Sequence, residues 1–210
     1  SNDGLALGET TDDAQYQLGL MYKTGDGVPQ NYNEAVKWYK LSAEQGNASA
    51  QHKMGWMYDT GQDVPEDDAK AVKWYRLAAE QGNGGAQNNL GRAYANGEGV
   101  PEDNVYAYMW FNIAASQGHA DARTNKEAVE RQMSQSELAE AQYNLGGAYA
   151  NGEGVAEDDV EAVKWYRLAA EKGEVEAQFN LGLAYDFGEG VVEDDAKAVG
   201  WYRLAGEQGD

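Results

Sequence analysis

Residues 141–173, AQYNLGGAYANGEGVAEDDVEAVKWYRLAAEKG, contain landmarks that return at fixed spacing in four other parts of the chain. The stretch opens on an alanine whose equivalents are Ala14, Ala50, Ala86, Ala141 and Ala177. Its tryptophan has the equivalents Trp38, Trp74, Trp110, Trp165 and Trp201. Ala14 and Ala50 are 36 residues apart, and this period holds along the chain except for one interruption between Ala86 and Ala141. Such a period indicates stacked helical repeats, each of which contacts chiefly its neighbours.

The composition supports a folded chain and excludes several classes of partner. Of the 210 residues, 42% are hydrophobic and only 3 are proline, which leaves enough apolar side chains for a core. The formal net charge of -20 repels phosphate groups, so we expect no nucleic-acid partner and no binding to anionic membranes. No apolar run is long enough for membrane insertion. Because cysteine is absent, the chain has neither a disulfide framework nor a thiolate metal site.

Each unit predicts two helices joined by a loop. In the first unit, Ala14, Leu18, Met21 and Tyr22 are spaced as one face of an amphipathic helix, which we name helix A. A GxGV loop ends helix A, since glycine adopts the left-handed conformation that closes a helix. The second helix, helix B, should follow an Asn or Asp that caps its N-terminus. These predicted caps are Asn31, Asp67, Asp103, Asp158 and Asp194.

A glycine recurs in the middle of helix A. Its positions are Gly19, Gly55, Gly91, Gly146 and Gly182. Glycine inside a helix costs roughly 1 kcal/mol relative to alanine, so its recurrence indicates a close approach between helices. We expect these glycines to make room for the tryptophan column.

The interruption lies at residues 119–140. Its sequence predicts an extra helix over 120–132, a break at Met133, and a capping box made by Ser134 and Glu137 at the start of the next helix. One extra helix cannot fit the alternation of helices A and B, so we expect a bend or an offset here. The predicted division is an N-terminal tail (1–11), repeats one to three (12–118), the inserted helix and junction (119–140) and repeats four and five (141–210).

The columns A-x3-LG-x2-Y-x2-G-x-GV-x2-D and A-x2-W[YF]-x3-A-x2-G resemble the SEL-1-like repeat family, a relative of the tetratricopeptide repeat. The resemblance implies an all-α fold, a right-handed α/α superhelix of about five repeats with one inserted helix. It also implies that the helices A line a concave groove and that the protein acts as an adaptor or scaffold, with no shared catalytic set. Cysteine-rich secreted members are associated with peptidoglycan, but this chain has no cysteine.

The groove columns of helix A are the candidate partner-binding residues. They are Tyr16, His52, Asn88, Tyr143 and Phe179 in one column, and Leu20, Trp56, Arg92, Gly147 and Leu183 one turn later. Aromatic and Arg side chains that are not needed for packing within the repeat are typical of binding hot spots. We therefore predict a site for a protein or peptide at Tyr16, His52, Trp56, Asn88, Arg92, Tyr143 and Phe179. The alternative for Tyr16 and Phe179 in particular is packing between helices.

The residues give no sign of catalysis. Only His52 and His119 are present as histidines, and none of the sequence motifs of nucleophilic or metal-dependent enzymes occurs. The acidic clusters of the loops, such as 157–159, fit helix capping better than calcium binding, because an EF-hand places its ligands at alternating positions. We expect no enzyme activity, no metal and no cofactor.

Two interpretations of function remain, together with two expectations about the ends of the chain. The first is a binding scaffold for a protein or peptide, and the alternative is a module that recognises carbohydrate or cell-wall fragments, with weak hydrolase activity at most. The last repeat lacks a polar capping helix, so its end could support self-association. Because the chain begins at Ser1, we expect a processed chain and weigh a bacterial periplasmic or secreted location above the cytoplasm.

Overall fold

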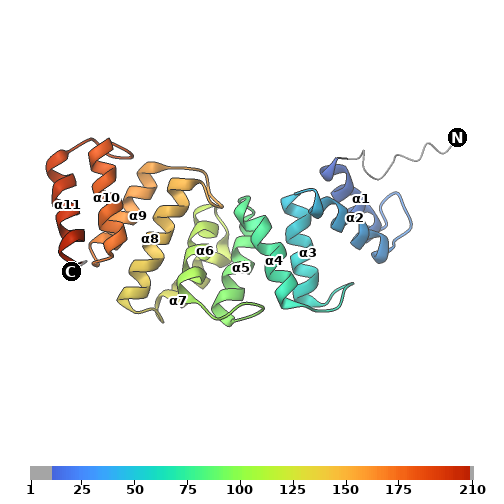
Figure 1. Ribbon diagram of the computed structural model, residues 1–210. Coiled ribbons are helices and arrows are strands. Elements are labelled where there is room, and N and C mark those ends of the chain that lie inside the picture. The colour runs from blue at the N-terminus through green and yellow to red at the C-terminus, as the bar shows by residue number, and fades with distance from the viewer. Residues whose placement is uncertain (1–10, 209–210) are drawn as a thin grey trace.

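The computed structural model describes residues 11–208, and every regular element in this range is an α-helix. The helices follow one another along an elongated array, from α1 at one end to α11 at the other (Figure 1). Their bounds are α1 (Asp12–Thr24), α2 (Tyr32–Glu44), α3 (Ala48–Thr60), α4 (Asp68–Glu80), α5 (Gly84–Asn96), α6 (Asn104–Ser116), α7 (Ala120–Glu130), α8 (Gln135–Asn151), α9 (Asp159–Ala170), α10 (Val175–Phe187) and α11 (Asp195–Gln208). The predicted all-α repeat architecture is confirmed. The predicted N-terminal tail, apart from Thr11, lies outside the described residues.

The helices pair as the repeat pattern predicts. Helices A are α1, α3, α5, α8 and α10, and helices B are α2, α4, α6, α9 and α11. We name α1–α6 the first array and α8–α11 the second array. Within residues 11–208, no helix combines the length and the apolar character that a membrane span requires.

The predicted caps of helix B are confirmed. In four cases, a side-chain oxygen of the cap accepts a hydrogen bond from the backbone N–H three residues later, as Asn31 does from Glu34 at 3.2 Å. The remaining cap, Asp103, accepts from the N–H groups two and three residues later. The backbone N–H of Asn31 also donates to the carbonyl of Tyr22 in helix A, at 2.8 Å. The same bond recurs in the other four repeats, so in each repeat it joins the end of the loop to helix A.

The mid-helix glycines make room for a different aromatic column from the one predicted. A Cβ atom on Gly55 would lie 2.5 Å from Cδ1 of Tyr75, and the other four glycines face the ring that follows each tryptophan. Those rings are Tyr39, Tyr75, Phe111, Tyr166 and Tyr202. The tryptophans lie one position earlier and, apart from Trp110, are only half-buried. The prediction was wrong because neighbouring residues of one helix point about 100° apart, which decides which ring enters the interface.

A second set of contacts, which the sequence analysis did not single out, joins successive repeats through glutamines. The glutamine after the first alanine of helix A is buried in every repeat, at Gln15, Gln51, Gln87, Gln142 and Gln178. Gln51 donates to the carbonyl of Ala43 at the end of the preceding helix B, and Gln87 and Gln178 repeat this bond. Its own Oε1 accepts from Gln81 at 2.7 Å, with equivalent pairs in repeats one and five. We name the buried glutamines of helix A, together with the glutamines that donate to them, the glutamine ladder.

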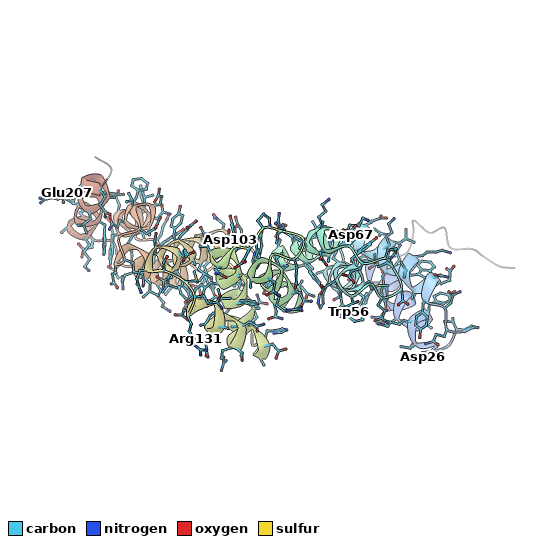
Figure 2. The ribbon with its side chains drawn as sticks, turned by 90° about the horizontal axis from the view of Figure 1, so that it is seen from below. Asp26, Trp56, Asp67, Asp103, Arg131 and Glu207 are labelled. Atoms are coloured by element: carbon cyan, nitrogen blue, oxygen red, sulfur yellow. The ribbon has the colours of Figure 1, made fainter. Side chains whose placement is uncertain are left out.

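The inserted segment forms a helix, α7, that follows α6 in the stack of the first array. Helix α7 packs on α6 and lies beside α5, as α5 lies beside α3, and α8 also packs on α6. Figure 2 shows Arg131, at the end of α7, projecting from one side of the array. The predicted capping box is confirmed: Ser134 accepts from the N–H of Glu137, and the Glu137 carboxylate accepts from the N–H of Ser134. Thus α7 takes the place of helix A of a fourth repeat, and α8 attaches to α6 beside it.

Helix α6 carries the junction because it is apolar around most of its surface. Nine of its residues are buried, among them Met109, Trp110 and Ile113, and α5, α7 and α8 all pack on it. A helix that is apolar all round needs partners on every side. Its sequence, NVYAYMWFNIAAS, has no charged residue, whereas the other helices B carry several. This absence is a sequence signal for the crowded junction.

The loop of repeat four shows how the second array is displaced. In repeats three and five, the second glycine of the loop, Gly99 or Gly190, lies against the first residue of the preceding helix B. The equivalent Gly154 lies instead at the end of α4, where an added Cβ would be 2.9 Å from the Ala79 carbonyl and 2.9 Å from Trp110. The second array is therefore offset from the first, in contact with repeat two as well as with repeat three.

Candidate functional site

The aromatic residues of the first groove column pack against the helix B rings that face the mid-helix glycines. Tyr16 contacts Tyr39 with 5.7 Å between ring centroids, and His52 contacts Tyr75 at 5.9 Å. Tyr143 and Phe179 contact the equivalent rings of their own helices B. One side of each ring is thus used for packing inside the repeat. The other side contributes to the surface, most of all at Phe179, which is 50% exposed.

Asn88 is covered by the inserted helix. Only 6% of Asn88 is exposed, and its side-chain carbonyl accepts a hydrogen bond from Asn125 of α7 at 3.0 Å. Asn88 is therefore not on the surface with its column neighbours. The sequence could not show this, because the contact depends on where α7 packs.

Trp56 is half-buried on α3 and contacts the core on both sides of that helix. Two lysines lie close to its indole: Nζ of Lys53 lies 4.4 Å from the ring centroid, and Nζ of Lys23 from α1 lies 5.2 Å from it. Burial, together with a contact to the Lys23 ammonium, lowers the pKa of Lys53 from 10.5 to about 8. The structure thus brings a cationic pair and an aromatic ring together on neighbouring helices A.

Arg92 is exposed on α5, one repeat further along the same column as Trp56. It lines a cavity of about 260 Å³ with Asn96, Asn125 and Gln132. Since Asn125 and Gln132 lie on and just after α7, this helix forms a wall at the end of the first array. We name Tyr16, Leu20, His52, Trp56 and Arg92 the first-array face.

Tyr143 and Phe179 do not join this face. Tyr143 lines a cavity of about 520 Å³ with Arg76, Tyr94 and Tyr106, which belong to the first array but not to its face. It also lines a second cavity of about 610 Å³ with Phe179, between α8, α10 and α11. The offset at the junction therefore divides the predicted groove residues between two surfaces.

The ring of His52 is surrounded by neighbouring groups. Its Nε2 lies 3.2 Å from the side-chain amide of Asn89, and its ring lies against Tyr75 and Gly85. Burial, and then the positive charges of Lys53 and His119, lower the pKa of His52 below 6.5. A neutral His52 leaves Lys53 and Lys23 as the cations of this part of the face.

Five matches to one family model, the Sel1 repeat, cover residues 12–47, 48–83, 85–119, 139–174 and 175–210. The chain belongs to the Sel1 repeat family. Sel1 repeat proteins generally mediate protein–protein interactions and are generally non-catalytic scaffolds.

Two solved structures of Sel1 repeat proteins are similar to the chain. One, from Oxalobacter formigenes, is 33% identical with a TM-score of 0.51, and the match covers 95% of this chain and 72% of that chain. The other is a protective antigen of uropathogenic Escherichia coli with an SLR fold, 38% identical with a TM-score of 0.49. That match covers 95% of this chain but only 38% of the antigen, so the present sequence spans well under half of its length. No curated protein matches the chain.

The helix-capping acids Asp67 and Asp103 lie away from Trp56. Figure 2 shows Asp67 and Asp103 along one edge of the array and Trp56 on the opposite edge. Asp67 caps α4, and its hydrogen bonds with Lys70 lower the pKa of its carboxyl group. These carboxylates are thus engaged at helix ends, and residues 11–208 contain no cluster of three His, Asp or Glu side chains arranged for a metal ion.

Lys23 and Lys53 were not among the binding residues predicted from the sequence. A signal for them exists inside the repeats: the positions equivalent to Lys53 are Gln17, Asn89, Asn144 and Asn180. The positions equivalent to Lys23 are Asp59, Ala95, Ala150 and Asp186. A charged residue that departs from its column is not needed for the Sel1 fold and therefore marks a candidate for binding.

Proposed function

We propose that this Sel1 repeat chain is a non-enzymatic scaffold that binds a segment of a partner protein on its first-array face. The observation that carries the proposal is Trp56. Its column holds Leu, Arg and Gly in the other repeats, so the indole serves no requirement of the repeat, yet its ring stays half-exposed. A large, rigid ring of this kind is typical of interface hot spots.

The surroundings of Trp56 support a protein partner. Tyr16 and His52 extend the aromatic surface along the face, and Arg92 adds an exposed cation with five hydrogen-bond donors. The wall made by α7 bounds the face at one end. The net charge of -20 disfavours nucleic acid, which leaves a polypeptide as the partner whose chemistry fits.

Affinity capture followed by mass spectrometry tests the proposal. The wild-type chain should capture a partner that Trp56→Ala and Arg92→Ala lose, because each change removes a large side chain from the face. Leu77→Ala is the matched control, since Leu77 is an exposed apolar residue of helix B outside this face. Equal capture by all four proteins would place the binding surface elsewhere.

A carbohydrate ligand is the second candidate, and it rests on the junction cavity of about 520 Å³. Tyr94 and Tyr106 stack there with 5.2 Å between their centroids, and the ring of Tyr106 is exposed. The lining also includes the carboxylate residues Glu80 and Glu153. Titration with soluble peptidoglycan fragments tests this candidate: saturable binding that Tyr106→Ala abolishes would favour it, and the absence of binding by wild type would reject it.

A further inference from the structure

Lys23 and Lys53 make no salt bridge among the described residues, although the charge of Asp63 acts on Lys53 from a longer distance. Among the described residues, no carboxylate lies within 4.0 Å of either ammonium group. Five of the lysines on helices B behave differently, whereas Lys73 of α4 makes no such pair. Lys37, Lys40, Lys70, Lys164 and Lys197 each pair with an acid on the same helix or at its N-cap.

The arrangement around Trp56 has a cost in the unbound protein. Both lysines are half-buried, and the charge of Lys23 opposes the protonation of Lys53. A cation gains some stabilisation over an indole, but the ring carries no net charge and therefore cannot neutralise the two ammonium groups. Neutral or acidic residues stand at these positions in the other repeats, so the fold does not require the pair.

We propose that Lys23, Lys53 and Trp56 form a docking site for an acidic segment of the partner protein. A carboxylate of that segment lies between the two ammonium groups, and an adjacent apolar side chain lies against the indole. This inference rests on the proposed function and specifies the chemistry of the partner at the first-array face. It also gives a role to two half-buried lysines that make no salt bridge on a chain with 36 acidic and 16 basic residues.

Charge complementarity favours an acidic segment over a basic one. A basic segment would have to place its cations beside two ammonium groups, and Asp63 is the one acid whose charge acts on Lys53. Arg92, exposed on the next helix A, extends the positive line in the direction of α7. Because the chain as a whole repels anions, binding of an acidic peptide requires local contacts and cannot arise from non-specific attraction.

A displayed random-peptide library, selected on the immobilised chain, tests the inference. The test protein carries Lys23→Gln and Lys53→Gln together. The matched control carries Lys37→Gln and Lys40→Gln, which remove the same charge from exposed lysines of α2. Neither pair of changes should lower the melting temperature by more than a few degrees, since none of the four side chains is in the core.

Wild type and control should select peptides in which Asp or Glu lies next to an aromatic or aliphatic residue. The test protein should lose this preference and bind a selected peptide about tenfold more weakly or worse, as expected for the loss of charge-assisted hydrogen bonds. A version of the peptide with Gln for the acid should bind wild type weakly and lose nothing further with the test protein.

The remaining outcomes separate this inference from the proposed function. Selected peptides that require Trp56 but show no preference for acids, or the same preference with the test protein, would overturn the docking site and leave the first-array face in place. Preference for basic peptides would also overturn it. Failure to select any peptide that depends on Trp56 would contradict the face itself.

Discussion

The side-chain amide of Gln87 donates a hydrogen bond to the backbone carbonyl of Gly154, 67 residues later in the chain, at 2.5 Å. Gln117 donates to the same carbonyl at 3.0 Å instead of to its expected partner in the glutamine ladder, the Oε1 of Gln87. That Oε1 is left buried without a partner among the described residues. At the junction, side-chain amides of the glutamine ladder therefore donate to the displaced loop of the second array.

Gly154→Ala should destabilise the junction. The glycine has φ of +73°, and a Cβ would lie 2.9 Å from both the Ala79 carbonyl and Trp110. Backbone strain and overpacking together should cost about 2–5 kcal/mol. Gly118→Ala is the control: its φ is +89° but nothing lies within 4 Å of the added carbon, so only the strain of about 1–2 kcal/mol remains. Equal losses in chemical denaturation would contradict the close contact at Gly154.

Gly55→Ala should destabilise the chain although alanine favours a helix. The new methyl group would meet the buried ring of Tyr75, and overpacking typically costs about 1–3 kcal/mol. Gly200→Ala, in the middle of α11 with open space around it, should instead stabilise by about 0.5–1 kcal/mol. Thermal and urea unfolding of both variants measure the difference. A stabilised Gly55→Ala variant would place the Tyr75 ring elsewhere.

Lys172→Gln should repair the ladder in repeat four. Repeats one, two and five place a glutamine at this position, and it donates to the ladder residue of its own helix A. With Lys172, the Oε1 of Gln142 is buried and has no hydrogen-bond partner within residues 11–208. Supplying the donor should raise the free energy of unfolding by about 1 kcal/mol, and Gln208→Lys should lower it by a similar amount. An unchanged stability for Lys172→Gln would mean that Gln142 is already satisfied in solution.

Stability should fall in mild acid in part because of His52. The pKa of His52 is about 6.5 in the unfolded chain and lower in the folded protein. At a pH between the two pKa values, the unfolded chain therefore binds a proton that the folded chain does not. The free energy of unfolding therefore decreases as the pH falls below 6.5. His52→Gln keeps an acceptor for Asn89 but cannot titrate, so its loss of stability between about pH 7 and about pH 5.5 should be smaller than that of wild type. Parallel losses would remove His52 as a source.

Self-association through the last repeat stays a prediction. Several apolar side chains there are exposed, among them Phe187, Val192 and Val199. Apolar surface of this kind favours contact with another copy. Light scattering should show a mass that increases with concentration, and Val199→Lys should reduce the increase. A constant monomeric mass for the wild-type chain would reject the prediction.

Local interactions explain the parts of the fold that could be predicted. The period, the two helices of each repeat, the caps at Asp67 and its equivalents, and the Ser134–Glu137 box depend on residues a few positions apart. Their residue types therefore suffice to predict them. The groove columns could also be named from the period, because a residue's place within its repeat fixes which way it points from helix A.

Contacts between helices, within a repeat and across the junction, decided the rest. Tyr75 and Trp74 compete for one space, and Tyr75 is the residue that is buried. Two other contacts join residues that are far apart in the sequence: α7 covers Asn88, and Gly154 approaches Ala79. The pairing of Lys23 with Lys53 over Trp56 likewise depends on how α1 packs beside α3. The sequence by itself therefore determined the repeat and its helices, since these depend on short-range chemistry. Only the tertiary structure decided which side chains meet, because a rotation or offset of one helix changes every long-range contact it makes.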